Sequence, residues 1–317
     1  MPSDAEESGN WLGPSVRGIG GASLLADLGH EVPTALLPSF LTSTLGAPAA
    51  ALGLIEGVSD GLAGAARLAG GALADDPERR RASAIGGYTA TAVLSGLVGA
   101  ATAAWQVGVL RAAAWTARGL RVPARNALLA DAVQPEVYGR AYGFERALDN
   151  LGAVLGPLLA LALVAVFSAR TAILLSIIPG MLAVVAIVYA IRHLPRLAVH
   201  ERQPLRIRIR PVMRGRLGGL MLGIGAFELG NIAATLLILR ATDVLAPGHG
   251  IDVATRLAIA LYVVYNVAAT VASFPAGGIS DRLGRRGPLL VTAAGVASFL
   301  LAYLLFAVSG PVLLVLG

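Results

Sequence analysis

Nine apolar segments dominate the sequence, and each is long enough to cross a lipid bilayer as a helix. They cover residues 17–45, 48–74, 83–103, 105–129, 141–167, 170–191, 216–240, 254–279 and 288–309. Backbone groups in hydrocarbon must be satisfied within the segment, so such segments fold as helices. We therefore expect an all-α polytopic membrane protein. A tenth segment begins at Pro311 and the chain stops at Gly317, which favours a C-terminally truncated chain.

The composition agrees with a membrane protein and excludes several classes of site. Hydrophobic residues make up 56% of the chain and charged residues 14%, against about 25% charged residues in soluble domains. The absence of Cys excludes disulfides and thiol catalysis. The absence of Lys excludes a phosphate-binding loop of the ATPase type. With no other catalytic constellation, we expect no enzyme activity, no cofactor and no resident metal.

The arginines predict the topology. With the N-terminus on the cytoplasmic side, 19 of the 25 basic residues fall on that side. This count includes Arg118, Arg121 and Arg125, near the end of the fourth segment. Arg170, Arg240 and Arg256 fall on the outer side. The asymmetry predicts a multi-pass inner-membrane protein with a cytoplasmic N-terminus, so the net charge of +6 needs no nucleic-acid partner.

The spacing of the segments predicts two halves. Residues 1–16 are polar and acidic and are expected to form a disordered tail, and residues 17–191 hold six helices. Residues 192–215 form an Arg-rich linker with three prolines, and residues 216–317 form an incomplete second half. The linker either binds anionic lipid head groups or is a solvated cytoplasmic loop.

Two internal repeats relate the halves. The hairpin G-G-I-S-D-R-L-G-R-R-G at 277–287 has a weaker counterpart, G-A-L-A-D-D-P-E-R-R-R, at 71–81. The stretch Asp27–Thr34 shares its acid, Leu-Gly, polar and Thr pattern with Glu228–Thr235, at an offset of 201 residues. Duplication of this kind in a membrane chain is typical of transporters, whose binding sites lie near the midplane between the halves.

The residues 277–286 resemble the loop motif of the major facilitator superfamily, and both copies stand where that family places it. A second resemblance is the fifth-helix pattern of proton-driven antiporters, formed by Gly143, Gly152, Gly156 and Pro157. A third is Arg111 followed by R-G-L-R-V-P-A-R-N, which is similar to the fourth-helix arginine motif of bacterial efflux members. The resemblance implies a bundle of two six-helix halves, the second incomplete, that works as a secondary transporter.

The resemblance also implies a role for the hairpins as latches that close one state and release as the halves rock. The residues concerned are Gly71, Asp75, Arg79, Arg80, Gly277, Asp281, Arg282, Gly284, Arg285 and Arg286. The alternative is an ordinary anchored turn. For the fifth-helix glycines and Pro157, the alternatives are a gating bend and plain close packing. The first hairpin departs from the motif at Asp76-Pro77-Glu78, so we expect it to be the weaker latch.

Ionisable residues within membrane segments are functional candidates because burying them is costly. Three acid pairs are spaced i, i+4 and so share a helix face. The candidates for substrate binding or proton coupling are Asp27, His30, Glu31, Glu56, Asp60, Arg111, Glu145, Asp149, Glu228 and Asn231. A carboxylate removed from water can exchange protons near neutral pH.

Structural roles remain open for all of these residues. Arg67 could neutralise Glu56 and Asp60, and hairpin arginines could hold Glu145 and Asp149. His30 could relay protons or be a satisfied structural group. Together with its two neighbouring acids, His30 could also be read as a ligand of a metal substrate.

These patterns lead to one main hypothesis and two alternatives. The main one is a secondary transporter that exports a small molecule in exchange for protons, with the bilayer, the substrate and protons as its partners. The first alternative is a non-transporting membrane fragment. The second is a proton-coupled importer of a sugar or an organic acid.

Overall fold

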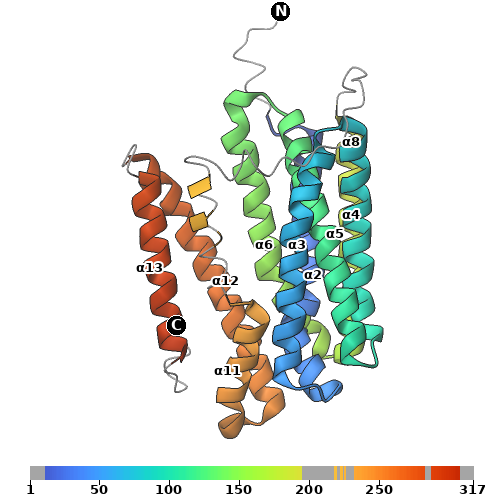
Figure 1. Cartoon of the computed structure of the whole chain (residues 1–317), viewed down its shortest axis with the longest axis vertical. Coiled ribbons are helices and arrows are strands. Elements are labelled where there is room, and N and C mark those ends of the chain that lie inside the picture. The colour runs from blue at the N-terminus through green and yellow to red at the C-terminus, as the bar shows by residue number, and fades with distance from the viewer. Residues whose placement is uncertain are drawn as a thin grey trace, which may run out of the picture.

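The computed structural model describes residues 11–194, 218–219, 222–223, 225, 232–282 and 287–307, and all regular elements in these ranges are helices. Six predicted segments of the first half become seven helices, because the sixth is interrupted at Ser176. Figure 1 shows the elements as a bundle of long, roughly parallel rods. The helices are α2 (Pro14–Ser39), α3 (Ala49–Ala74), α4 (Pro77–Leu97), α5 (Ala104–Asp131), α6 (Tyr138–Val164), α7 (Ala169–Leu175), α8 (Ile177–His193), α11 (Ala234–His249), α12 (Ile251–Arg282) and α13 (Gly287–Ala307).

The predicted segments and the helices agree closely in the first half and less well in the second. The segment predicted at 48–74 is α3 at Ala49–Ala74, and the segment at 105–129 is α5. In contrast, the segment predicted to end at residue 240 continues to His249, and the next helix begins at Ile251. The glycine between them, Gly250, has φ of 77°, a left-handed conformation that glycine adopts without strain.

The first hairpin is tight because its sequence starts a helix. Asp76 precedes α4 and its carboxylate accepts hydrogen bonds from the backbone N–H groups of Glu78 (3.0 Å) and Arg79 (3.3 Å). Pro77 occupies the first helical position, where a missing N–H costs nothing. The Asp-Pro-Glu sequence that departs from the family motif is therefore an N-terminal cap of α4.

Apart from α7 and α8, which are the two parts of one interrupted segment, successive helices run in opposite directions, so their connections alternate between two ends of the bundle (Figure 1). We call the end where α3 meets α4 the hairpin end; α5 ends and α6 begins there, as α12 ends and α13 begins. The other end, where α2 leads into α3 and α11 into α12, is the opposite end. Within the first half, α2 packs on α6 and α8, and α5 packs on α3 and α4. The halves meet where α12 packs on α6 and α11 packs on α2.

The apolar core is divided between the two ends. At the opposite end a cluster joins both halves: Phe40 and Leu52 from the first half pack with Ile238 and Ile259 from the second. At the hairpin end a second cluster, centred on Ile19, belongs to the first half. The ionisable residues lie between these two apolar layers.

The outer faces of several helices suit a lipid environment. On α8 the exposed residues Ile178, Leu182, Val185 and Tyr189 form one apolar stripe, while the other face of the helix is buried. Four helices of the described residues are long and apolar enough to span a membrane: Pro77–Ala100, Arg140–Val164, Ala169–His193 and Ile251–Ala268. The 26-, 26- and 28-residue helices α2, α3 and α5 are long enough but carry the ionisable residues of the bundle interior.

Candidate functional site

A belt of charged and polar side chains crosses the interior of the first half between the two apolar layers. We call it the charge belt and define it by thirteen residues from four helices. Most of them are buried, and Asp60 and Arg146 are exposed. The members are Asp27, His30 and Glu31 on α2, Glu56 and Asp60 on α3, Arg111, Trp115, Arg118, Arg121 and Arg125 on α5, and Glu145, Arg146 and Asp149 on α6.

The first group of the belt is built around His30. Its Nδ1 lies 3.3 Å from Asp27 Oδ1 and 3.2 Å from the carbonyl oxygen of Ala26. Its Nε2 lies 2.7 Å from Arg118 Nη1 and 3.4 Å from Glu31 Oε1. Arg118 also pairs with Asp27 at 3.5 Å. A guanidinium can only donate, so Nε2 accepts from Arg118 and the ring proton of neutral His30 sits on Nδ1.

The same geometry argues against a metal at this group. The carboxylates of Asp27 and Glu31 face different nitrogens of the His30 ring, so the three side chains do not converge on one point. Within the residues that the structure describes, no group of three or more His, Cys, Asp or Glu side chains is placed to hold a metal ion.

Glu31 also reaches the second half. Its Oε2 accepts a hydrogen bond of 3.1 Å from the phenol of Tyr262 on α12. Nothing in the sequence pattern around Tyr262 predicted this contact, because it joins residues 231 positions apart.

The second group is built around Arg111. Its guanidinium pairs with the Glu56 carboxylate at 3.0 Å, donates to Thr34 Oγ1 at 3.2 Å and stacks on the Trp115 ring at 3.5 Å. The indole N–H of Trp115 donates to Asp60 at 3.0 Å. The partners of this acid pair are therefore on α5.

Arg67, which could have neutralised that acid pair, lies on the exposed face of α3. The expectation that it does so is wrong: Arg111 and Trp115 hold the two acids instead.

The third group is built around Arg125. Its Nη1 lies 2.7 Å from Glu145 and 3.5 Å from Asp149, and Ser23 completes the group by donating to Glu145 at 2.7 Å. Arg146 pairs with Asp149 at 2.8 Å from the exposed side. In the described residues the partner of this acid pair is an arginine inside α5, while Arg80 of the first hairpin pairs with Asp131.

Arg121 completes the row on α5 by packing over the ring of Tyr88, 4.0 Å from its centroid. The two residues border a small cavity of about 10 Å³. The hydroxyls of Tyr88 and Ser95 are buried and lack a hydrogen-bond partner in the described structure. The cavity is lined by Ala26, Gly29, His30, Tyr88, Thr91, Ala92, Ser95, Arg121, Ser176 and Gly180.

The structure corrects the prediction that Arg118, Arg121 and Arg125 belong to the cytoplasmic side. All three lie inside α5, and Arg121 and Arg125 are only 3% and 6% exposed. For Arg118 and Arg125 the signal that could have placed them inside is their spacing: with Arg111 and Trp115 they recur every three, four or seven residues and share one helix face.

Two of the four residues of the fifth-helix glycine and proline pattern, all of them on α6, lie directly against the belt. A Cβ atom added to Gly152 would stand 2.8 Å from Asp27 Cβ, and one added to Gly156 would stand 2.4 Å from Glu31 Cβ. Gly143 faces open space, and Pro157 is accommodated inside a continuous helix. The glycines 152 and 156 thus let α6 approach the acid pair of α2.

The hairpin residues lie at one end of the belt. Arg80 donates to the carbonyl oxygen of Ala74 at 2.7 Å and pairs with Asp131 at the end of α5. Arg79 pairs with Asp76 at 3.6 Å, whereas Asp75 is exposed. Gly71 lies in the last turns of α3.

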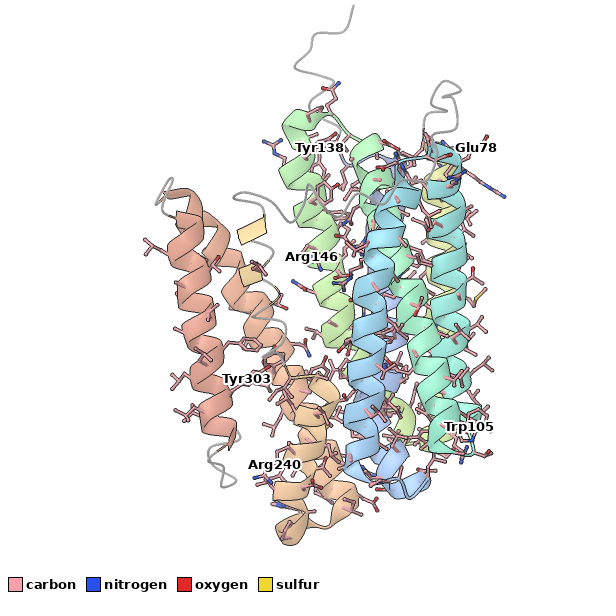
Figure 2. The ribbon with its side chains drawn as sticks, viewed as in Figure 1. Glu78, Trp105, Tyr138, Arg146, Arg240 and Tyr303 are labelled. Atoms are coloured by element: carbon pink, nitrogen blue, oxygen red, sulfur yellow. The ribbon has the colours of Figure 1, made fainter. Side chains whose placement is uncertain are left out.

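The second hairpin and part of the repeat lie largely outside this description. Gly277, Asp281 and Arg282 are the last residues of α12 by their backbone. The candidates outside the described residues are Glu228, Asn231, Gly284, Arg285 and Arg286. In Figure 2, Arg146 of the belt lies between the hairpin end, marked by Glu78 and Tyr138, and the opposite end, marked by Trp105 and Arg240.

Comparison with known proteins gives a consistent picture. The family model of the Major Facilitator Superfamily matches residues 19–317. An uncharacterized MFS-type transporter of Methanocaldococcus jannaschii is 26% identical over 301 residues, which are 94% of this chain and 74% of that protein. An uncharacterized protein of Mycobacterium tuberculosis is 34% identical over 197 residues, 62% of this chain and 47% of its own length.

Solved structures share the fold. A bacterial homologue of the human lysosomal transporter Spinster, in an inward-facing and unoccupied conformation, aligns with a TM-score of 0.60 at 16% identity over 90% of this chain and 64% of its own. A D-xylose–proton symporter aligns with a TM-score of 0.57 at 15% identity, over 96% of this chain and 76% of its own. The chain thus spans less than two thirds of the length of some of these relatives.

The helical bundle, the two halves that meet through α2, α6, α11 and α12, the apolar outer faces and the family match lead to the same assignment. The chain is a multi-pass membrane protein that belongs to the major facilitator superfamily.

Proposed function

We propose that this protein is a secondary active transporter that exports a small molecule across a bacterial inner membrane in exchange for protons. The observation that supports proton coupling is the charge count of the belt. Three acid pairs on α2, α3 and α6 face a row of basic side chains on α5. With His30 neutral, the belt holds six carboxylates against the five guanidinium groups of Arg111, Arg118, Arg121, Arg125 and Arg146, so uptake of one proton balances it.

His30 is the position in the belt where a proton and a guanidinium compete. Its Nε2 accepts from Arg118 at 2.7 Å, so a proton can bind there only if Arg118 withdraws. Glu31 lies 3.4 Å from the same nitrogen and would pair with the imidazolium that forms. Proton entry at His30 and displacement of Arg118 from α2 are therefore two parts of one event.

We propose that the hairpin end faces the cytoplasm. Its contacts are the proposed latch. The Arg80–Asp131 pair joins the start of α4 to the end of α5. Its charge-assisted bonds would form in one state and break in the other as the halves rock. We assign the same role to Asp281 and Arg282 of the second hairpin, together with Gly284, Arg285 and Arg286.

Export rather than import is favoured by the close approach of α6 to the acid pair of α2. Gly152 and Gly156 belong to the pattern that resembles proton-driven antiporters, and both pack against that pair. The substrate class stays open, and the assay below includes the classes expected of an importer.

Transport by the reconstituted chain tests the proposal. Proteoliposomes loaded with the pH indicator pyranine would be challenged with ethidium, D-xylose and lactate, representing lipophilic cations, sugars and organic acids. We expect one class of compound to drive protons in the direction opposite to its own movement. Asp27→Asn and Glu31→Gln should abolish this proton movement. Asp243→Asn, which removes an exposed carboxylate on α11, is the matched control and should keep wild-type rates.

Movement of substrate and protons in the same direction would refute export by antiport and favour the importer. Proton movement that persists in Asp27→Asn and Glu31→Gln would remove the charge belt from the mechanism. The absence of any transport across a broader panel would favour a chain that does not transport by itself.

A further inference from the structure

The carboxylate of Glu31 is shared between the two halves of the molecule. One oxygen, Oε1, faces His30 at 3.4 Å, and the other, Oε2, accepts the hydrogen bond of 3.1 Å from Tyr262. Glu31 is 8% exposed, and its Oε2 is bound from a helix of the second half. The charge of Glu31 therefore affects contacts in both halves of the molecule.

Both partners of this hydrogen bond are held in place. The Cβ of Glu31 packs so closely on α6 that a side chain at Gly156 would overlap it. The ring of Tyr262 stacks on Tyr265, with centroids 6.2 Å apart and an interplanar angle of 16°. Asn266 donates to the backbone carbonyl of Tyr262 at 2.9 Å. A small movement of α12 relative to α2 thus directly changes the distance between Tyr262 and Glu31.

The strength of the contact depends on the charge of Glu31. A phenol that donates to an ionised carboxylate forms a stronger hydrogen bond than one that faces a neutral carboxyl group. Among the described residues, the titratable and charged groups near Glu31 are Asp27 and His30 from α2, Arg118 from α5 and Tyr262 from α12, while α6 presents Gly156. Of these, Tyr262 alone belongs to the second half.

We infer that Tyr262 is a positioning residue that couples the charge of Glu31 to the arrangement of the two halves. When Glu31 is ionised, the bond holds α12 against α2; when Glu31 is neutral, the contact weakens and the second half is released. This inference rests on the proposed proton-coupled function, since it assigns the residue through which the state of the acid pair reaches the second half.

Distance measurements between the halves test the inference without knowledge of the substrate. The chain has no native Cys, so a spin-label pair can be introduced directly at Ala82→Cys on α4 and Leu290→Cys on α13, two exposed positions on different halves. Double electron–electron resonance in nanodiscs would give the distance distributions. We expect Glu31→Gln, which removes the charge, to shift the distribution relative to that of the wild type.

Tyr262→Phe, which removes one oxygen atom, should shift the distribution in the same direction as Glu31→Gln and by at least half as much. The double variant Glu31→Gln/Tyr262→Phe should differ little from Glu31→Gln alone, because both changes remove the same bond. Tyr265→Phe is the matched control: it removes the same group one turn along α12, from a residue that is 43% exposed, and should leave the wild-type distribution unchanged.

An unchanged distribution in Glu31→Gln or in Tyr262→Phe, or an equal shift in Tyr265→Phe, would each overturn the inference. Failure of the proposed function gives a different result. Flux in the pyranine assay would then be absent, or insensitive to Glu31→Gln, while the coupled shift in distances could still be present.

Discussion

The substitution Gly156→Ala tests how closely α6 is required to approach the acid pair of α2. The added methyl carbon would stand 2.4 Å from Glu31 Cβ and 3.3 Å from the carbonyl oxygen of Leu28. Carbon atoms in good contact are about 3.5–4.0 Å apart, so the overlap is roughly 1.1–1.6 Å. Neither atom is the end of a flexible side chain, and the helices have to separate locally.

The expected cost follows from this overlap. Inserting a methyl group into a well-packed interior costs about 1–3 kcal/mol. One kcal/mol shifts the melting temperature by roughly 2–4 °C in a chain of comparable size. We therefore expect Gly156→Ala to lower the melting temperature by about 2–12 °C. It should also displace Glu31 from His30 and Tyr262, so proton-driven flux in proteoliposomes should fall.

Gly143→Ala supplies the control on the same helix. Its Cβ would meet nothing within 4 Å, and alanine is favoured over glycine in a helix by about 1 kcal/mol. Thermal unfolding of the detergent-solubilised protein, followed by tryptophan fluorescence, should show an unchanged or raised melting temperature for this variant. Equal melting temperatures for the two alanine variants would refute the reasoning, because they would mean that the α2–α6 contact absorbs a methyl group freely.

Three further predictions concern the belt and the hairpin. Arg125→Met should destabilise the fold by about 3–5 kcal/mol, because it leaves the buried Glu145 carboxylate without a charged partner, and adding Glu145→Gln to the same chain should recover part of that loss in a thermal-unfolding assay. A high-resolution map should show one ordered water bonded to Tyr88 and Ser95, since a cavity of about 10 Å³ with two unsatisfied hydroxyls meets the requirements of a buried water; an empty cavity would contradict this. Arg80→Gln should change stability by less than about 1 kcal/mol, because the pair is partly exposed, yet it should alter the transport rate if the hairpin is a latch.

The part of the fold that could be predicted is the part set by local sequence. Apolar segment length fixed the helices of the first half to within a few residues, and the division of the sixth segment at Ser176 left no hydropathy signal. The three acid pairs were found because their i, i+4 spacing is local. Their partners were not found, because ion pairing depends on which helix faces which, and that is decided by packing between distant segments.

The arginines of α5 show where sequence reasoning went wrong. Arg118, Arg121 and Arg125 stand close to the end of an apolar segment, and the positive-inside rule assigned them to the cytoplasmic side. That rule assumes that a basic residue is stabilised by water or lipid head groups. Here buried carboxylates and an aromatic ring stabilise two of them inside the bundle, so their placement reflects tertiary pairing rather than topology.

The partners of the three acid pairs all lie on α5. Each pair lies on a different helix, yet Arg111, Arg118 and Arg125 present their guanidinium groups from one face of a single helix, with successive spacings of seven residues. A rotation or shift of α5 that lengthens one ion pair must change the other two, because the three side chains move with the same backbone. Under the proposed mechanism, withdrawal of Arg118 from His30 would therefore alter the pairing of Glu56 and of Glu145 without any direct contact between these acids.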